Sequence, residues 1–266
     1  MYDLLGGYLL LCSKLGQQGR KPLSHKEFHK FLSLDTDLRS AALHPQCPKA
    51  LPGLIADHPL MQQYARRRPE DIIALILPDS RYPKIVKDRL GSEAPGLLWC
   101  KGNLSLLERP AISVVGSRDP GPAAVEFTRR VGQMAARQGF VLVSGNAGGT
   151  DTLAQNACLE AGGYVISVVA DSLLDKQAHD HILYLSEDDY DQRFSGPRAL
   201  SRNQVIHAMG QRTYVSQSGW GRGGTYSGTY RNLKNRWSPV FMHSDGSTAA
   251  TEFAAMGANL ITTRDL

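Results

Sequence analysis

The sequence predicts an α/β protein with a mostly parallel sheet, preceded by a small helical N-terminal region. Two short apolar runs, Ile112–Val115 and Phe140–Val143, are rich in β-formers and too short for helices, as expected of buried parallel strands. Each run ends in Gly and Ser residues and is followed by a helical pattern. Two such units in tandem imply a right-handed crossover between parallel strands. We therefore expect a helical region at residues 1–70 and an α/β domain at residues 71–266.

The N-terminal region, residues 1–70, shows apolar residues at helical spacing, interrupted by prolines. Ser24 and Glu27 predict a capping box at the start of one helix, because this spacing lets each side chain pair with the backbone N–H of the other residue. Arg66–Arg68 is either a phosphate contact or a solvated helix end, and the sequence leaves both open. The first residues lack the basic start and the cleavage pattern of a signal peptide.

From residue 71 onward, strand patterns alternate with helical patterns, and Gly or Pro residues mark most of their ends. The expected strands are Asp71–Pro78, Gly96–Gly102, Ile112–Val115, Phe140–Val143, Tyr164–Val169, Ile182–Leu185, Thr213–Ser216 and Pro239–Met242, with Gly257–Ile261 closing the fold. The expected helices run from Pro83 to Leu90, from Pro122 to Gly139, from Asp151 to Gly162 and over Ala249–Met256, with others after Thr225 and within the acidic segment 171–191.

The composition favours a cytoplasmic protein with an anionic partner. The formal net charge is +5, which attracts polyanions. The four cysteines are scattered without a Cys-x-x-Cys pair, so neither a disulfide framework nor a zinc cluster is expected. The histidines show no ligand spacing, and no apolar run reaches the roughly 18 residues of a membrane span. We expect no metal and no membrane contact.

Small and basic residues follow the first two central strands at the point where each strand ends. Ligands of parallel sheets bind beyond the carboxyl ends of the strands, where glycines admit a close backbone approach and free N–H groups attract anions. Arg118 adds a guanidinium fork that suits phosphate. The alternative is that the glycines only form tight turns. The predicted binding residues here are Gly116, Ser117, Arg118, Ser144, Gly145, Asn146, Gly148, Gly149, Thr150 and Asp151.

The balance of charge reverses after the acidic segment. Residues 192–244 contain no Asp or Glu, and their Arg and Lys residues are interleaved with aromatic rings such as Phe194 and Trp220. Cations that follow a phosphate backbone, mixed with rings that stack on bases, are typical of single-stranded nucleic acid binding. The alternative is that the rings belong to the core, as we expect for Tyr214, and the cations are scattered over the surface. A third glycine-rich loop adds Arg222, Gly223, Gly224 and Thr225 to the predicted site.

Eight short motifs lie in one order along the chain: Tyr82-Pro83, Gly102-Asn103, Val114–Arg118, Ser144–Asp151, Ser186-Glu187, Arg202-Asn203, Gly223–Thr225 and Gly257–Ile261. Together they resemble the DprA/Smf family, DNA processing protein A, over residues 72 to 263. The resemblance implies an extended Rossmann-like, three-layer fold of the LOG/SLOG group. It implies a cytoplasmic protein without catalysis or cofactor, which binds single-stranded DNA in natural transformation and recombination. The implied partners are a second copy of the chain and a RecA-type recombinase.

The resemblance also implies roles for single residues. Arg118 and Arg202 would be the main phosphate contacts, and Asn203 would line the pocket beside the glycine-rich loops. Asp151 would cap the following helix and hold its loop. Many members carry a C-terminal winged helix, which the sequence lacks up to its last residue, Leu266.

Two other function classes stay open. One is a nucleotide-binding sensor or phosphoribohydrolase-like enzyme of the same fold; the enzymes need a catalytic Glu after their Gly-Gly-Thr loop, but no carboxylate follows Thr225 before Asp245. The other is an interaction module with a vestigial pocket. The interaction module stays open because Ala199-Leu200-Ser201 and Gln204 stand where the family has basic residues around Arg202-Asn203; Gln155, where the family has His, is a further departure.

Overall fold

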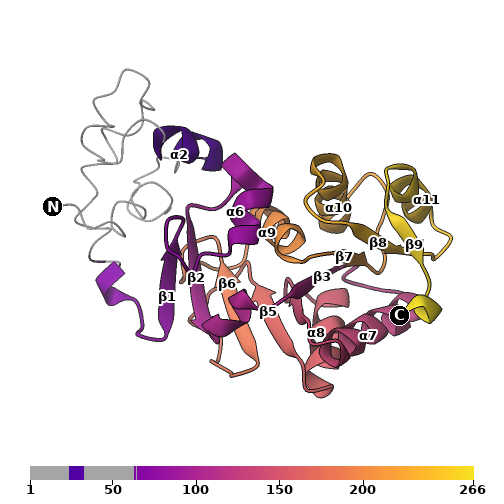
Figure 1. Cartoon of the computed structure of the whole chain (residues 1–266), viewed down its shortest axis with the longest axis horizontal. Helices are drawn as coiled ribbons and strands as arrows, with labels where there is room; N and C mark the ends of the chain where they lie inside the picture. Colours follow the sequence, from indigo (N-terminus) through magenta and orange to yellow (C-terminus); the bar gives the residue numbers. More distant parts are fainter. Residues whose placement is uncertain (1–23, 33–62, 64) are drawn as a thin grey trace.

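A nine-stranded sheet runs through the part of the chain that the computed structural model describes, residues 24–32, 63 and 65–266 (Figure 1). The four strands β6 to β3 and the three strands β7 to β9 all pair in parallel, while β1 and β2 add antiparallel strands at one edge. In spatial order the strands are β1 (Ile72–Ile76), β2 (Leu97–Gly102), β6 (Ile182–Ser186), β5 (Tyr164–Val168), β4 (Val141–Ser144), β3 (Ala111–Val115), β7 (Thr213–Val215), β8 (Val240–His243) and β9 (Asn259–Ile261). The predicted strands and the mostly parallel sheet are confirmed.

Helices cover both faces of this sheet. In Figure 1, α7 and α8 lie on the side opposite to α10 and α11. The helices are α2 (His25–Leu32), α6 (Lys84–Leu90), α7 (Pro122–Arg137), α8 (Thr150–Glu160), α9 (Gly196–Met209), α10 (Gly224–Asn235) and α11 (Thr248–Ala255), with short 3-10 turns η1 (Gly91–Glu93), η2 (Leu104–Glu108) and η3 (Thr263–Asp265). No helix of the described residues has the length and apolar character needed to span a bilayer. The expected three-layer α/β fold is confirmed.

The central strands are buried on both faces, which explains why they read as unbroken apolar runs. Along β3, Ile112 and Val114 pack in one cluster with α7 and α8, whereas Ala111 and Val115 pack in another cluster with α9. Successive side chains of a strand point to opposite faces, so both faces must be apolar when both are covered.

The order of the strands changes direction between β3 and β7. From β3 the chain proceeds through β4 and β5 to β6 on one side, then returns through α9 to β7 on the other side. A crevice opens beyond the carboxyl ends of the strands at such a switch point. This topology places the loop after β3 next to the loop after β7, and therefore fixes the position of a ligand site.

Two sequence predictions need correction, and others are not addressed. Segment 171–191 forms β6 but no helix, and α9 was not predicted. Helix α9 buries Arg202, Gln204 and His207 beside its apolar residues, so its sequence lacks a clean apolar stripe. The helices expected near residues 4–11 and 38–42 lie outside the described residues, and the proposed boundary at residue 70 stays a prediction.

The capping box predicted at the start of α2 is confirmed. The backbone N–H of Ser24 donates to Glu27 Oε2 at 2.8 Å, and the backbone N–H of Glu27 donates to Ser24 Oγ at 3.4 Å. The Ser24 hydroxyl also donates to Glu27 Oε2 at 2.7 Å, and this bond, together with the one from the Ser24 backbone N–H, holds the pKa of the Glu27 carboxyl below its usual value. Helix α2 lies against η1, where Lys26 pairs with Glu93 at 3.3 Å.

A buried polar cluster fixes α9 against α10. The Asn232 side-chain amide donates to His207 Nδ1 at 3.1 Å and accepts from the backbone N–H of Ser238 at 2.8 Å. The Ser238 hydroxyl donates to the His207 carbonyl at 3.0 Å. Burial disfavours the charged imidazole and lowers the pKa of His207 from 6.5 to about 3. The neutral ring is thus part of the folded state.

This histidine makes the fold sensitive to mild acid. The unfolded chain takes up a proton near pH 6.5 and the folded chain only near pH 3, so stability is complete above pH 6.5 and falls as the pH drops below it. At pH 5 the loss is about 2 kcal/mol, at roughly 1.4 kcal/mol per pH unit. Urea unfolding at pH 7 and pH 5 measures it. His207→Gln does not titrate there, so an equal loss in both proteins would contradict this prediction.

Candidate functional site

A pocket of about 450 Å³ lies beyond the carboxyl ends of β3 and β7, at the switch point. Each of the three glycine-rich loops contributes to its wall, and α9 contributes the side opposite to them. The structure therefore brings together segments that are more than a hundred residues apart in the sequence. The lining residues are Val115, Gly116, Ser117, Arg118, Ala147, Gly148, Asp151, Gly196, Ala199, Leu200, Arg202, Asn203, Ile206, Gly223, Gly224 and Thr225.

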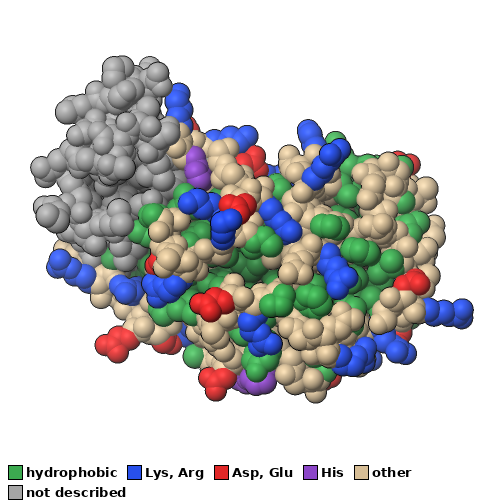
Figure 2. All heavy atoms as spheres, viewed as in Figure 1, with side chains coloured by type: hydrophobic (Ala, Val, Ile, Leu, Met, Phe, Trp, Pro, Cys, Tyr) green, Lys and Arg blue, Asp and Glu red, His purple; other side chains and the backbone are tan. Residues whose placement is uncertain are grey.

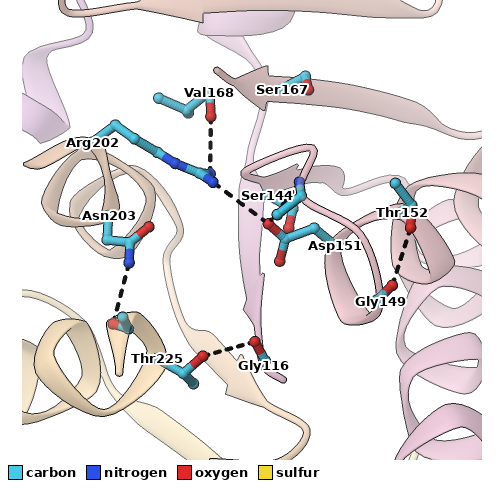
Figure 3. A network of polar contacts seen from close by, with 12 residues as sticks. Gly116, Ser144, Gly149, Asp151, Thr152, Ser167, Val168, Arg202, Asn203 and Thr225 are labelled. Carbon is cyan, nitrogen blue, oxygen red and sulfur yellow. Dashed lines mark hydrogen bonds and ion pairs between the residues drawn. The ribbon is translucent and has the colours of Figure 1, made fainter. Parts of the chain in front are cut away.

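Hydrogen bonds hold the three loops in a fixed relation (Figure 3). The backbone N–H of Thr150 donates to the Ser117 carbonyl at 3.0 Å, which joins the first loop to the second. The Thr225 hydroxyl donates to the Gly116 carbonyl at 2.7 Å, which joins the first loop to the third. Asn203 of α9 donates from its side-chain amide to the Gly224 carbonyl at 3.2 Å. The pocket is thus preorganised on both sides.

Arg202 forms the floor of the pocket rather than a free cation at its mouth. Its side chain is almost fully buried, and its Nη1 donates to the Val168 carbonyl at 3.0 Å. Its Nη2 lies 3.8 Å from Asp151 Oδ2, as the dashed line in Figure 3 marks. Nε finds no acceptor in the described part of the chain. The phosphate contact predicted for Arg202 stays a prediction, because the unpaired Nε is buried and could meet a phosphate only after the side chain moves.

Gly145 makes room for that guanidinium. A Cβ on Gly145 would lie 1.2 Å from Arg202 Nη1, so any other residue fits here only if the guanidinium moves. The loop therefore needs glycine here for a close side-chain approach, not for a turn with positive φ. The tight-turn interpretation does hold for Gly149, whose φ is 80°.

Asp151 does not cap α8, which corrects the role that the resemblance implied. The N-cap is Gly149, and Asp151 lies in the first turn. Its Oδ2 accepts a hydrogen bond from the backbone N–H of Ala147 at 3.2 Å, so the second half of the expectation, that it holds the loop, is confirmed. Burial raises the pKa of Asp151, an effect that the charge of Arg202 opposes.

Six of the predicted site residues do not line the pocket. Ser144 donates to the Val114 carbonyl at 2.8 Å, and the Thr150 hydroxyl lies 2.8 Å from Ser216 Oγ, so both side chains hold the loops from behind. Arg222 is exposed beside the third loop. The second loop also contains Gly145, Asn146 and Gly149, but these three residues do not line the pocket.

The pocket residues that the sequence missed come mainly from α9. Gly196, Ala199, Leu200 and Ile206 lie on its wall. A start signal for this helix was present, because Ser195 is an N-cap whose hydroxyl accepts from the backbone N–H of Arg198 at 3.4 Å, and a proline follows within the first turn.

Both interpretations of the aromatic and basic residues hold in part. Tyr214 and Trp237 are core residues, and Arg198 is buried against Asp188 at 2.8 Å. Phe194 is 55% exposed, however, and the guanidinium of exposed Arg118 lies 5.7 Å from its ring centroid. An exposed ring and a cation therefore stand together at the pocket.

The Gly145 contact predicts a sharp difference between two glycines of one loop. Gly145→Ala must displace the Arg202 guanidinium from Val168 and Asp151, and should lower the free energy of unfolding by about 1–3 kcal/mol. Gly148→Ala is the matched control, since a Cβ there meets nothing within 4 Å and should change stability by less than about 0.5 kcal/mol. Urea unfolding of both variants decides the matter, and equal losses would refute the assigned contact.

Comparisons with known proteins agree with this architecture. Residues 74–265 match the family model described as DNA recombination-mediator protein A. DNA processing protein DprA of Streptococcus pneumoniae is 34% identical over 139 residues, which cover 47% of this chain and 48% of that protein. DprA of Bacillus subtilis is 28% identical over 165 residues, 58% of this chain and 54% of that protein. The chain spans about half the length of the curated relatives it matches.

Solved structures show the same fold. The X-ray structure of DprA from Streptococcus pneumoniae superposes with a TM-score of 0.77 at 25% identity, covering 98% of this chain and 96% of that chain. DNA processing protein A from Helicobacter pylori, described for its single-stranded DNA binding mode, gives a TM-score of 0.61 at 24% identity over 73% of this chain and 93% of that chain. The match over residues 74–265 identifies the chain as a member of the DNA recombination-mediator protein A family, the family of DprA and Smf.

Proposed function

We propose that this protein is a non-catalytic, single-stranded DNA-binding protein of DNA processing, acting in DNA uptake and recombination. The observation that carries the proposal is the convergence of three glycine-rich loops and α9 on one pocket, with Arg118 exposed at its wall. The pocket would hold the strand by its sugar-phosphate backbone.

The electrostatics of the pocket suit a phosphate. Three helices begin at its wall, since Asp151 lies in the first turn of α8, Gly196 starts α9 and Gly224 starts α10. The N-terminus of a helix carries a partial positive charge and free N–H groups, which favour anions. Arg118 adds a full charge, while the negative charge of Asp151 is compensated by Arg202.

The shape and the rim favour a single strand over a duplex. A pocket of about 450 Å³ admits a nucleotide but no base pair within a double helix. Phe194 and Leu200, 55% and 51% exposed, offer apolar contacts to bases that are not stacked in a duplex. The relative from Helicobacter pylori, described as binding single-stranded DNA, supports the same assignment here.

The partners and the compartment are part of the same proposal. We extend the proposal to a cytosolic homodimer that cooperates with a RecA-type recombinase, and membership of this family supports that extension. The edge strand β9 supports pairing with a second copy, since among the described residues it pairs with β8 alone and its Leu260 is 46% exposed.

A nucleotide-cleaving enzyme of the same fold is the second candidate, and one observation favours it. Asp151 lies on the pocket wall with a raised pKa, as a general acid would. Against this, the carboxylate is nearly buried and is held by Arg202 and the Ala147 N–H. Nucleoside monophosphates incubated with the protein should release no base; release that Asp151→Asn abolishes would establish the enzyme instead.

Fluorescent oligo-dT and a duplex of equal length, titrated across salt concentrations, test the proposal. We expect the single strand to bind more tightly, with an affinity that falls as salt rises. Arg118→Ala should weaken binding about tenfold or more and reduce the salt slope by about 0.7, because it removes one charged phosphate contact. Arg137→Ala is the matched control, an exposed arginine at the end of α7.

The outcomes separate the candidate functions. Equal affinity for duplex and single strand, or an Arg118→Ala variant that binds as the wild type does, would contradict the proposal. Tight binding of a mononucleotide without affinity for oligo-dT would favour the nucleotide sensor.

A further inference from the structure

A second, smaller pocket lies beside the first, between α9 and α10. Its volume is about 140 Å³, and Leu200, 51% exposed, lines both pockets. The polar groups on its wall come from Ser201 and Gln204 of α9 and from Ser227 and Arg231 of α10, and Trp237 closes one side. None of these side chains belongs to the predicted site, so the pocket is unassigned.

The donors of this pocket are only partly used. Arg231 donates from Nη2 to Glu93 Oε2 at 2.6 Å and to Gln204 Oε1 at 3.2 Å. Its Nε and Nη1 have no acceptor among the described residues, and neither do the hydroxyl groups of Ser201 and Ser227. The guanidinium lies 5.3 Å from the centroid of the Trp237 ring, within the range of a cation–π contact. A half-exposed fork and two hydroxyl groups therefore face a space that is too small for a base pair.

The charge of the pocket stays positive although a carboxylate is near. Glu93 accepts from Arg231 on one oxygen and pairs with Lys26 of α2 at 3.3 Å on the other. Among the described residues, two cations, Arg231 and Lys26, therefore pair with this one carboxylate. In Figure 2, Lys and Arg side chains lie on both sides of the hollow between the region of α6 and the region of α10, with Asp or Glu side chains among them on the α6 side.

We propose that this second pocket binds a phosphodiester of the same DNA strand, next to the part held in the first pocket. The proposal rests on the proposed function, because it requires a strand in the first pocket. A planar guanidinium with two free nitrogens and two hydroxyl donors matches the oxygens of a phosphate. Leu200, between the two pockets, would contact the sugar or base that joins the two phosphates. Glu93 then acts as an internal counter-ion that holds Arg231 in place and competes with the phosphate.

Oligo-dT of graded length, titrated across salt concentrations, tests this site. Arg231→Gln should weaken the binding of long oligonucleotides about tenfold and reduce their salt slope by about 0.7, the share of one phosphate contact on a single strand. The loss should vanish as the oligonucleotide becomes too short to reach beyond Leu200. Glu93→Gln should strengthen the binding of long oligonucleotides, since it removes the competing charge.

Two further variants guard against trivial results. Ser201→Ala with Ser227→Ala removes the hydroxyl donors but keeps the Arg231–Glu93 pair, so its weaker binding of long oligonucleotides cannot come from a lost fold contact. Lys234→Gln makes the same change of charge on the exposed side of α10 and should leave binding unchanged. Urea unfolding of each variant checks that it is folded.

The possible failures are distinguishable. If Arg118→Ala weakens binding but Arg231→Gln and the double Ser variant do not, the second pocket is refuted and the proposed function stands. If Arg231→Gln weakens short and long oligonucleotides equally, Arg231 acts through α9 and the subsite is refuted. A wild type that binds no oligo-dT refutes both. Inorganic phosphate that competes beyond the effect of chloride at equal ionic strength would assign the pocket to free phosphate instead.

Discussion

The buried contact between Arg202 and the loop before α8 determines the geometry of the whole pocket. The Arg202 guanidinium lies over Gly145, donates to the end of β5 at Val168 and faces Asp151 in the first turn of α8. It thereby joins α9, which belongs to the return crossover, to the first half of the sheet. A buried ion pair adds little net stability, because desolvation of both groups offsets their attraction. The role of this ion pair is to position α9, which forms one wall of the pocket, relative to the glycine-rich loops.

This arrangement explains what the sequence could and could not reveal. Strands such as Ile112–Val115 are buried on both faces, so an unbroken run of apolar residues is enough to predict them. Helix α9 is buried too, but Arg202 and His207 lie on its buried face, where an amphipathic helix normally has apolar side chains. Its partners lie far away in the sequence: Asp151 and Val168 for Arg202, and Asn232 for His207. A local pattern cannot show that such polar residues are satisfied by distant groups.

In the candidate site, too, some features could be predicted from the local sequence and others depend on distant contacts. The glycine-rich loops were recognisable because each follows a strand, and parallel strands bring their carboxyl ends to one edge. The inner and outer residues of each loop were not distinguishable, since Gly145 and Gly148 look alike in the sequence. Only the folded structure distinguishes them: Gly145 packs against the Arg202 guanidinium, and Gly148 lines the pocket. The resemblance implies a helix cap for Asp151, whereas its carboxylate accepts the loop hydrogen bond from the Ala147 N–H.

Rigidity and access are divided between different residues of the site. Arg202, Thr150 and Ser144 are buried and bonded, so they fix the loops but have little freedom to follow a ligand. Arg118 and Phe194 are exposed and contact one another, so they are free to adapt to strands of different sequence. A protein that holds DNA by its phosphates without reading bases needs such a combination, because the backbone repeats while the bases vary. In the proposed complex, the invariant phosphate backbone would meet the rigid floor and helix ends, and the variable bases would meet the adaptable rim.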